Sequence, residues 1–157
     1  MRQGGVDVLM IGDSITQGWS AEGRHVWSTY YGHRLAVNLG FSRDCTEHVL
    51  WRLNHGEIDG IAPRLAVVMI GTNNIGARRD PPEETAAGIQ AILSTLRTGL
   101  PDTKILLLGV FPRGASGDDP LRQVTVAINN LARTYADNKQ IFFLDLSPLF
   151  LDNQGRL

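Results

Sequence analysis

The sequence is poor in cysteine, in long apolar runs and in charge of one sign, and each shortage excludes a class of protein. The one cysteine, Cys45, rules out an internal disulfide and a thiolate metal cage. The longest apolar runs, residues 65–70 and 105–111, are far shorter than the ~18 residues that a membrane-spanning helix needs. Fifteen basic and sixteen acidic residues give a net charge of -1, so there is no electrostatic case for binding nucleic acid or an anionic membrane.

The chain has the size and composition of one globular domain. Its 157 residues are 43% hydrophobic, which suits a single core, so we expect one domain over residues 1–157. The first apolar stretch, residues 6–11, is short and contains Asp7, so no signal peptide is predicted. We therefore expect a cytoplasmic protein.

Five short apolar runs predict five buried strands, at residues 6–11, 35–39, 65–70, 105–108 and 141–144. Each run is continuously apolar, a pattern typical of parallel strands that are buried on both faces. Helical patterns lie between them, at residues 46–53, at 81–98, and from about Pro120 with Val124, Ile128, Leu131 and Tyr135 on one face. This alternation predicts a three-layer α/β/α sandwich around a mainly parallel five-stranded sheet.

Polar residues follow the first and third predicted strands. Asp13 and Ser14 come after the first strand, and Asn73 comes after the third. Helix capping or a turn would explain each residue taken alone. Ligands of parallel sheets collect at the carboxyl ends of the strands, where a serine oxygen and an amide donor could support acyl transfer. Thr16 stands where the nucleophile elbow of α/β-hydrolases needs glycine, and a phosphate-binding loop is absent.

The residues at these strand ends resemble a known enzyme family. Gly12-Asp13-Ser14 and Gly71-Thr72-Asn73 are similar to two signature blocks of the SGNH (GDSL-type) esterases and lipases. Residues 47–57, 111–114 and 120–123 resemble the branch that holds the catalytic subunits of brain-type platelet-activating factor acetylhydrolase and their bacterial relatives. The resemblance implies a flavodoxin-like fold, no cofactor, and hydrolysis of a small or short-acyl ester.

The resemblance also implies the roles of individual residues. Ser14 is the expected nucleophile, and the side chain of Asn73 and the backbone N–H groups of Arg43 and Ser14 are the expected oxyanion-hole donors. Asp13 and Gly40 are assigned to substrate binding, with helix capping and a turn as their alternatives. Relatives usually have glycine in place of Arg43, so either this loop is rearranged or the guanidinium contacts substrate.

The general base of the family is missing from the sequence. The family places an Asp-x-x-His block after the fifth strand, and no aspartate here has histidine three positions later. All four histidines lie within the first 55 residues, and no metal-ligand spacing joins them. We expect a chain that is truncated at its C-terminus, lacks its last helix, leaves apolar sheet surface uncovered, and is inactive or nearly so.

Three functions stay open at this point. The first is a serine ester hydrolase with a small-molecule ester as its partner, paired into a homodimer as the resembled subunits are. The second is a non-catalytic binding or scaffold module on the same fold. The third is a flavodoxin-like cofactor binder, which the absent phosphate loop disfavours. Cys45 is expected to be buried, with a thiol pKa lowered by the helix dipole as the alternative.

Overall fold

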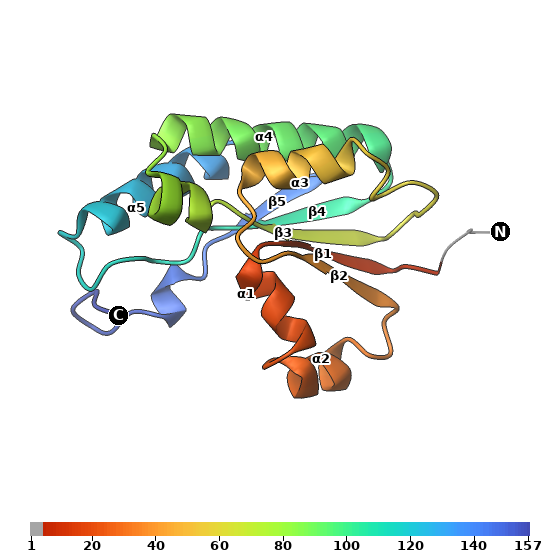
Figure 1. Cartoon of the computed structure of the whole chain (residues 1–157), viewed down its shortest axis with the longest axis horizontal. Coiled ribbons are helices and arrows are strands. Elements are labelled where there is room, and N and C mark those ends of the chain that lie inside the picture. The colour runs from red at the N-terminus through yellow and green to blue at the C-terminus, as the bar shows by residue number, and fades with distance from the viewer. Residues whose placement is uncertain (1–4) are drawn as a thin grey trace.

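The protein is built around a five-stranded sheet in which every strand pairing is parallel (Figure 1). The computed structural model describes residues 5–157, and residues 1–4 of the predicted domain lie outside the described part. The strands run in the order β2-β1-β3-β4-β5. Their bounds are Val8–Gly12 for β1, Ala36–Gly40 for β2, Leu65–Met69 for β3, Lys104–Leu108 for β4 and Ile141–Leu144 for β5. The predicted parallel five-stranded sheet is confirmed.

The helices that connect the strands begin where the local sequence favours helix starts. Asp119 caps α5, because its carboxylate accepts the N–H of Leu121 at 2.8 Å. In α4, Pro82 is followed by two glutamates in the first turn, where acidic side chains favour the positive end of the helix dipole. The helices are α1 (Ser14–Gln17), α2 (Arg24–Tyr30), α3 (Thr46–Leu53), α4 (Pro82–Gly99) and α5 (Pro120–Arg133), with short turns at Gly18–Ser20, Asn74–Arg78 and Ser147–Leu149.

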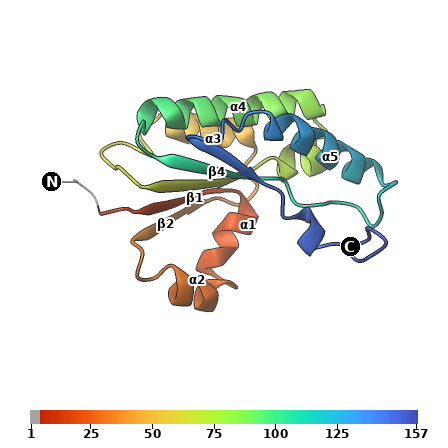
Figure 2. The same ribbon diagram turned by 180° about the vertical axis from the view of Figure 1, so that it is seen from behind.

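One face of the sheet carries the main hydrophobic core. Helices α3, α4 and α5 cover this face, and α1 and α2 lie on the other (Figures 1 and 2). Alternate strand residues such as Leu9, Val68 and Ile105 have no exposed surface and pack against Ile92 and Leu96 of α4. The predicted three-layer α/β/α sandwich is confirmed.

The opposite face of the sheet is only partly covered. An apolar cavity of about 660 Å³ lies there, with Met10 and Val67 on the sheet side and Trp19 and Tyr31 on the helix side. On β5, Phe142 and Leu144 are 37% and 43% exposed. The prediction that each strand is buried on both faces is therefore wrong for β5, because α1 and α2 lie beneath β1 and β2 instead (Figures 1 and 2). Within residues 5–157, no helix is long and apolar enough to cross a membrane.

Helix α5 departs from its predicted apolar stripe. It ends at Arg133, before Tyr135, and its buried residues include the polar Arg122 and Asn129. Arg122 donates to the backbone carbonyl oxygens of Arg113 and Gly114, and Asn129 exchanges two hydrogen bonds with the backbone of Val110. The inward face of the helix is thus used partly to hold the loop after β4, which apolar periodicity cannot predict.

Candidate active site

Ser14 is the first residue of α1 and lies on the surface at the carboxyl end of β1. The preceding residue, Asp13, caps this short helix, because its Oδ1 accepts the N–H of Ile15 at 2.9 Å. The backbone N–H of Ser14 has no acceptor within residues 5–157, as expected for the first position of a helix. The hydroxyl and one free N–H donor are therefore presented together at this strand end.

The carboxyl group of Asp13, the residue before Ser14, is buried. It has no exposed surface, and its Oδ2 has no hydrogen-bond partner in the described residues. Burial raises its pKa above the ordinary value of 3.8, and the nearby Asp44 carboxylate raises it further. A substrate cannot reach this carboxyl group in the observed conformation, so its visible role is to cap α1.

Gly40 lies at the end of β2 where the chain passes against α1. A Cβ atom at this position would come within 2.3 Å of the backbone nitrogen of Gln17, which real side chains do not do. Gly40 is buried, and its N–H donates to Oδ1 of Asn38 at 2.9 Å. The residue therefore lets β2 approach the helix that carries Ser14.

The loop after β2 forms a tight turn with Arg43 in its third position. The N–H of Asp44 donates to the carbonyl oxygen of Phe41 at 3.2 Å and closes the turn. Arg43 has a φ of 67°, the left-handed conformation that favours glycine. Despite the arginine, the backbone here keeps a conformation that favours glycine, and the Arg43 side chain is exposed. Contact of the guanidinium with substrate, the other alternative from the sequence, stays a prediction. The N–H of Arg43 has no acceptor within residues 5–157.

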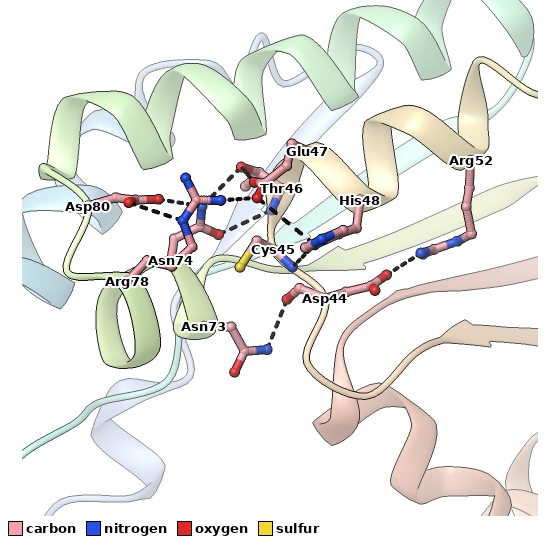
Figure 3. Close-up of polar contacts among 10 residues, drawn as sticks. All are labelled: Asp44, Cys45, Thr46, Glu47, His48, Arg52, Asn73, Asn74, Arg78 and Asp80. Carbon is pink, nitrogen blue, oxygen red and sulfur yellow. Dashed lines mark hydrogen bonds and ion pairs between the residues drawn. The ribbon is translucent and has the colours of Figure 1, made fainter.

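Asn73 joins the loop after β3 to the loop after β2. Its Nδ2 donates to the backbone carbonyl oxygen of Asp44 at 2.9 Å (Figure 3). The next residue, Asn74, is 2% exposed; its Oδ1 accepts the N–H of Thr46, and its Nδ2 donates to Oδ2 of Asp80 at 3.0 Å. Two consecutive amides therefore fasten these loops together.

The strand order brings the predicted site residues to one edge of the sheet. Strand β1 lies between β2 and β3, and Gly12 is in register with Gly40 and Met69. Ser14 therefore follows β1, and the Asn73–Asp44 hydrogen bond joins the loops that follow the two neighbouring strands, β3 and β2. At this edge Ser14 and Arg43 are exposed, and Asn73 is partly buried.

No histidine accompanies Ser14 in the described part of the chain. Among residues 5–157, no hydrogen bond joins a histidine to the Ser14 hydroxyl, and His25, His33 and His55 are exposed elsewhere. His48 has a structural contact, because its Nδ1 accepts the N–H of Cys45 at 3.0 Å. The described residues thus hold the predicted nucleophile without an adjacent base.

Three potential metal ligands lie close together at the start of α3. Ligand atoms of Cys45, Glu47 and His48 are within 4.8 Å of one another. Each group has another role: Nδ1 of His48 accepts a backbone N–H, Glu47 pairs with Arg78, and burial raises the pKa of the Cys45 thiol (Figure 3). The predicted burial of Cys45 is confirmed. The alternative of a lowered thiol pKa is wrong, because burial and then the nearby Glu47 carboxylate raise this pKa. These groups do not form a free ligand set.

Several residues that shape this edge were not singled out from the sequence. Asn74, Asp80 and Thr46 form one network, and Arg52 pairs with Asp44. The adjacent pair Asn73-Asn74 was the available signal for the first network. Asn74 and Thr46 are 28 residues apart in the sequence, so no local pattern could have joined them.

Comparison with known proteins gives the family. Residues 10–157 match the profile of the GDSL-like Lipase/Acylhydrolase family. Platelet-activating factor acetylhydrolase IB subunit alpha2 of Homo sapiens is 40% identical over 152 residues, which are 96% of this chain and 64% of the human protein. Subunit alpha1 of Homo sapiens is 35% identical over 96% of this chain and 63% of that protein. The chain spans less than two thirds of the length of these curated relatives.

Solved structures share the fold. An acetylxylan esterase from Geobacillus stearothermophilus superposes with a TM-score of 0.73 and 20% identity, covering 96% of this chain and 80% of that one. An alpha/beta hydrolase from the metagenome of Lake Arreo gives a TM-score of 0.70 and 18% identity, covering 97% of this chain and 87% of that one. With the family profile matched along nearly the whole described chain, this protein belongs to the GDSL-like lipase/acylhydrolase family, a family of ester hydrolases.

Proposed function

We propose that this protein carries the nucleophile and oxyanion hole of a serine ester hydrolase, with Ser14 as the nucleophile. The observation that carries the proposal is the hydrogen bond from Asn73 to the Asp44 carbonyl oxygen, which holds the flanking loops together around the end of β1. In a parallel sheet, the carboxyl ends of adjacent strands are where ligands bind.

The proposed chemistry follows from the donors around Ser14. The Ser14 hydroxyl oxygen attacks the ester carbonyl carbon, and the carbonyl oxygen becomes an oxyanion. The Asn73 amide has two N–H bonds, of which Asp44 accepts one and the oxyanion would accept the other. The unpaired backbone N–H groups of Ser14 and Arg43 would complete the oxyanion hole. Asp13 and Gly40 support this arrangement from beneath the surface rather than by contact with substrate.

Proton transfer is the step that the described residues do not supply. A serine hydroxyl is a weak nucleophile at neutral pH unless a base removes its proton, and no histidine contacts Ser14. We therefore expect the 157-residue chain to have little turnover by itself. A small base added to the solution, such as imidazole, should restore part of the acylation rate.

Hydrolysis of p-nitrophenyl acetate by the purified chain, with and without imidazole, tests this proposal. The matched control is Ser14→Ala, which removes the nucleophile from an exposed position with little effect on packing. Hydrolysis that depends on Ser14 and rises with imidazole supports the proposal. Equal rates for the two proteins at every imidazole concentration would contradict it.

We infer that the substrate is an ester with a short acyl group. Both an acetylhydrolase and an acetylxylan esterase are among the proteins similar to this chain, and their names refer to acetyl esters. Rates with acetyl, butyryl and octanoyl p-nitrophenyl esters would test this inference, with the acetyl ester expected to react fastest. Cytoplasmic location and homodimer formation are further proposals, and size-exclusion chromatography tests the second.

A second candidate is a non-catalytic binding module on the same fold. It is favoured by the absence of a histidine contact to Ser14 and by the exposed charge of Arg43 at the edge of the site. This candidate predicts that ester analogues bind without Ser14-dependent turnover, even with imidazole present. The two candidates are thus separated by the same assay.

A further inference from the structure

Arg52 of α3 holds both ends of the turn that presents Arg43. Its guanidinium lies 4.2 Å from the centre of the Phe41 ring, and its Nη1 pairs with the carboxylate of Asp44 (Figure 3). Phe41 and Asp44 are the first and last residues of the turn. One side chain therefore contacts the turn on both sides of the proposed backbone donor.

The ion pair is shielded from water and is oriented by a further carboxylate. The side chains of Arg52 and Asp44 are only 17% and 12% exposed. Nε of Arg52 also donates to Oε1 of Glu57 at 2.8 Å, and the Glu57 side chain is 11% exposed. The planar guanidinium can make these contacts and stack on the ring at once, which a lysine ammonium cannot reproduce. The side chain is thus fixed in one geometry.

The same contacts reach the second proposed donor. Asp44, whose carboxylate pairs with Arg52, is also the residue whose carbonyl oxygen accepts the amide of Asn73. Movement of the Asp44 backbone would therefore displace both the N–H of Arg43 and the side chain of Asn73. Oxyanion stabilisation depends on donors held in place before the reaction, so small displacements matter.

We propose that Arg52 is a positioning residue for the oxyanion hole, acting through Phe41 and Asp44. The inference rests on the proposed function, because it gives Arg52 a role in the same reaction. A shielded ion pair adds little net stability, because the cost of removing two charges from water offsets their attraction. Arg52 lies outside the reacting groups and is not itself a catalytic residue.

The test compares Arg52→Lys with Arg133→Lys. Arg133 is a control of the same kind but more exposed: it also stacks on an aromatic ring, Phe143 at 4.7 Å, and pairs with a carboxylate, Asp145 at 3.6 Å, at the far edge of the sheet. In imidazole-supported hydrolysis, Arg52→Lys should lower kcat by about 10- to 100-fold with little change in KM. Arg133→Lys should leave both constants unchanged.

A second variant keeps the inference falsifiable if Arg52→Lys folds poorly. Asp44→Asn removes the carboxylate but retains the carbonyl oxygen that Asn73 needs. It should also lower kcat, by no more than Arg52→Lys does, because the contact between Arg52 and Phe41 remains. The double variant should be little worse than Arg52→Lys alone, because both changes weaken the same ion pair. Strictly multiplicative losses in the double variant, or a wild-type kcat in folded Arg52→Lys, would overturn the inference.

Hydrogen–deuterium exchange separates this inference from the proposed function. Amides of residues 41–46 should exchange faster in Arg52→Lys than in wild type, and those in Arg133→Lys should not. If the wild-type chain shows no Ser14-dependent hydrolysis, the proposed function fails while exchange still reports on the loop. Unchanged exchange in Arg52→Lys would overturn the positioning role whether or not the chain is active.

Discussion

Nδ2 of Asn73 lies 2.9 Å from the backbone carbonyl oxygen of Asp44 and donates a hydrogen bond to it. The two residues come from loops that follow β3 and β2, the strands on either side of β1. The contact fixes the position of the amide and orients the backbone that follows Arg43. The side chain of Asn73 and the backbone N–H of Arg43, the two donors that we propose for the oxyanion hole, are therefore coupled through Asp44.

The left-handed conformation of Arg43 predicts that glycine is more stable at this position. A non-glycine residue in this region costs about 1–2 kcal/mol, and the greater freedom of glycine in the unfolded chain offsets about 0.5–1 kcal/mol of that. We expect Arg43→Gly to raise the free energy of unfolding by about 0.5–1 kcal/mol, measured by urea denaturation. Ser42→Gly is the control, because Ser42 has no positive φ and should gain nothing.

The same variant tests whether the Arg43 guanidinium contributes to binding. The backbone N–H is kept in Arg43→Gly, so Ser14 acylation should proceed at a similar or higher rate. A large rise in KM with unchanged kcat would instead assign substrate contact to the side chain.

The fold could be predicted further from the sequence than the site could. The strands lie within two residues of their predicted bounds, and α3 matches residue for residue, because continuous apolar runs and helix periodicity are local signals. Helix α2 was missed, because Arg24–Tyr30 has no capping side chain, no acidic first turn and no buried residue. The partly buried pair of Asp44 and Arg52 is a tertiary contact and has no pattern in the sequence.

The site residues also divide into those that local sequence signals predict and those that only the structure shows. Ser14 and Asn73 follow strands, so strand prediction placed them at one edge of the sheet. The positive φ of Arg43 was not predictable from the residue type, because arginine disfavours that region. The burial of Asp13 was also missed, because an aspartate is equally suited to cap a helix and to contact a substrate, so the residue type does not tell the two roles apart.

The backbone of α1 lies so close to Gly40 that adding a single methyl group there is predicted to destabilise the fold. Gly40→Ala would put Cβ within 2.3 Å of the backbone of α1, which must then shift. We expect a loss of about 1–3 kcal/mol in the free energy of unfolding. Gly117→Ala is the matched control, because a Cβ there would meet no atom within 4 Å. A loss for Gly40→Ala no larger than that of the control would contradict the packing argument.

The buried carboxyl group of Asp13 predicts a loss in the free energy of unfolding that depends on pH. Since its folded-state pKa is raised, the folded protein holds this proton more tightly than the unfolded chain does. The penalty is absent below the ordinary carboxyl pKa of 3.8 and develops as pH rises through the folded-state value.

Asp13→Asn tests this penalty while keeping an oxygen to cap α1. The variant should be more stable than wild type at pH 7, and the difference should shrink as pH falls toward 4, in melts recorded across that range. A variant that is less stable at pH 7 would show that the ionised carboxylate is favoured by the fold.

Acetylation of Ser14 itself is the most direct test of the catalytic assignment. The chain is treated with p-nitrophenyl acetate and imidazole, and the peptide that contains Ser14 is followed by mass spectrometry in wild type and Asn73→Ala. The account predicts acetyl transfer to Ser14 that slows about 100- to 1,000-fold when the Asn73 amide is removed. An unmodified Ser14, or equal acetylation of Ser14 in both proteins, would contradict it.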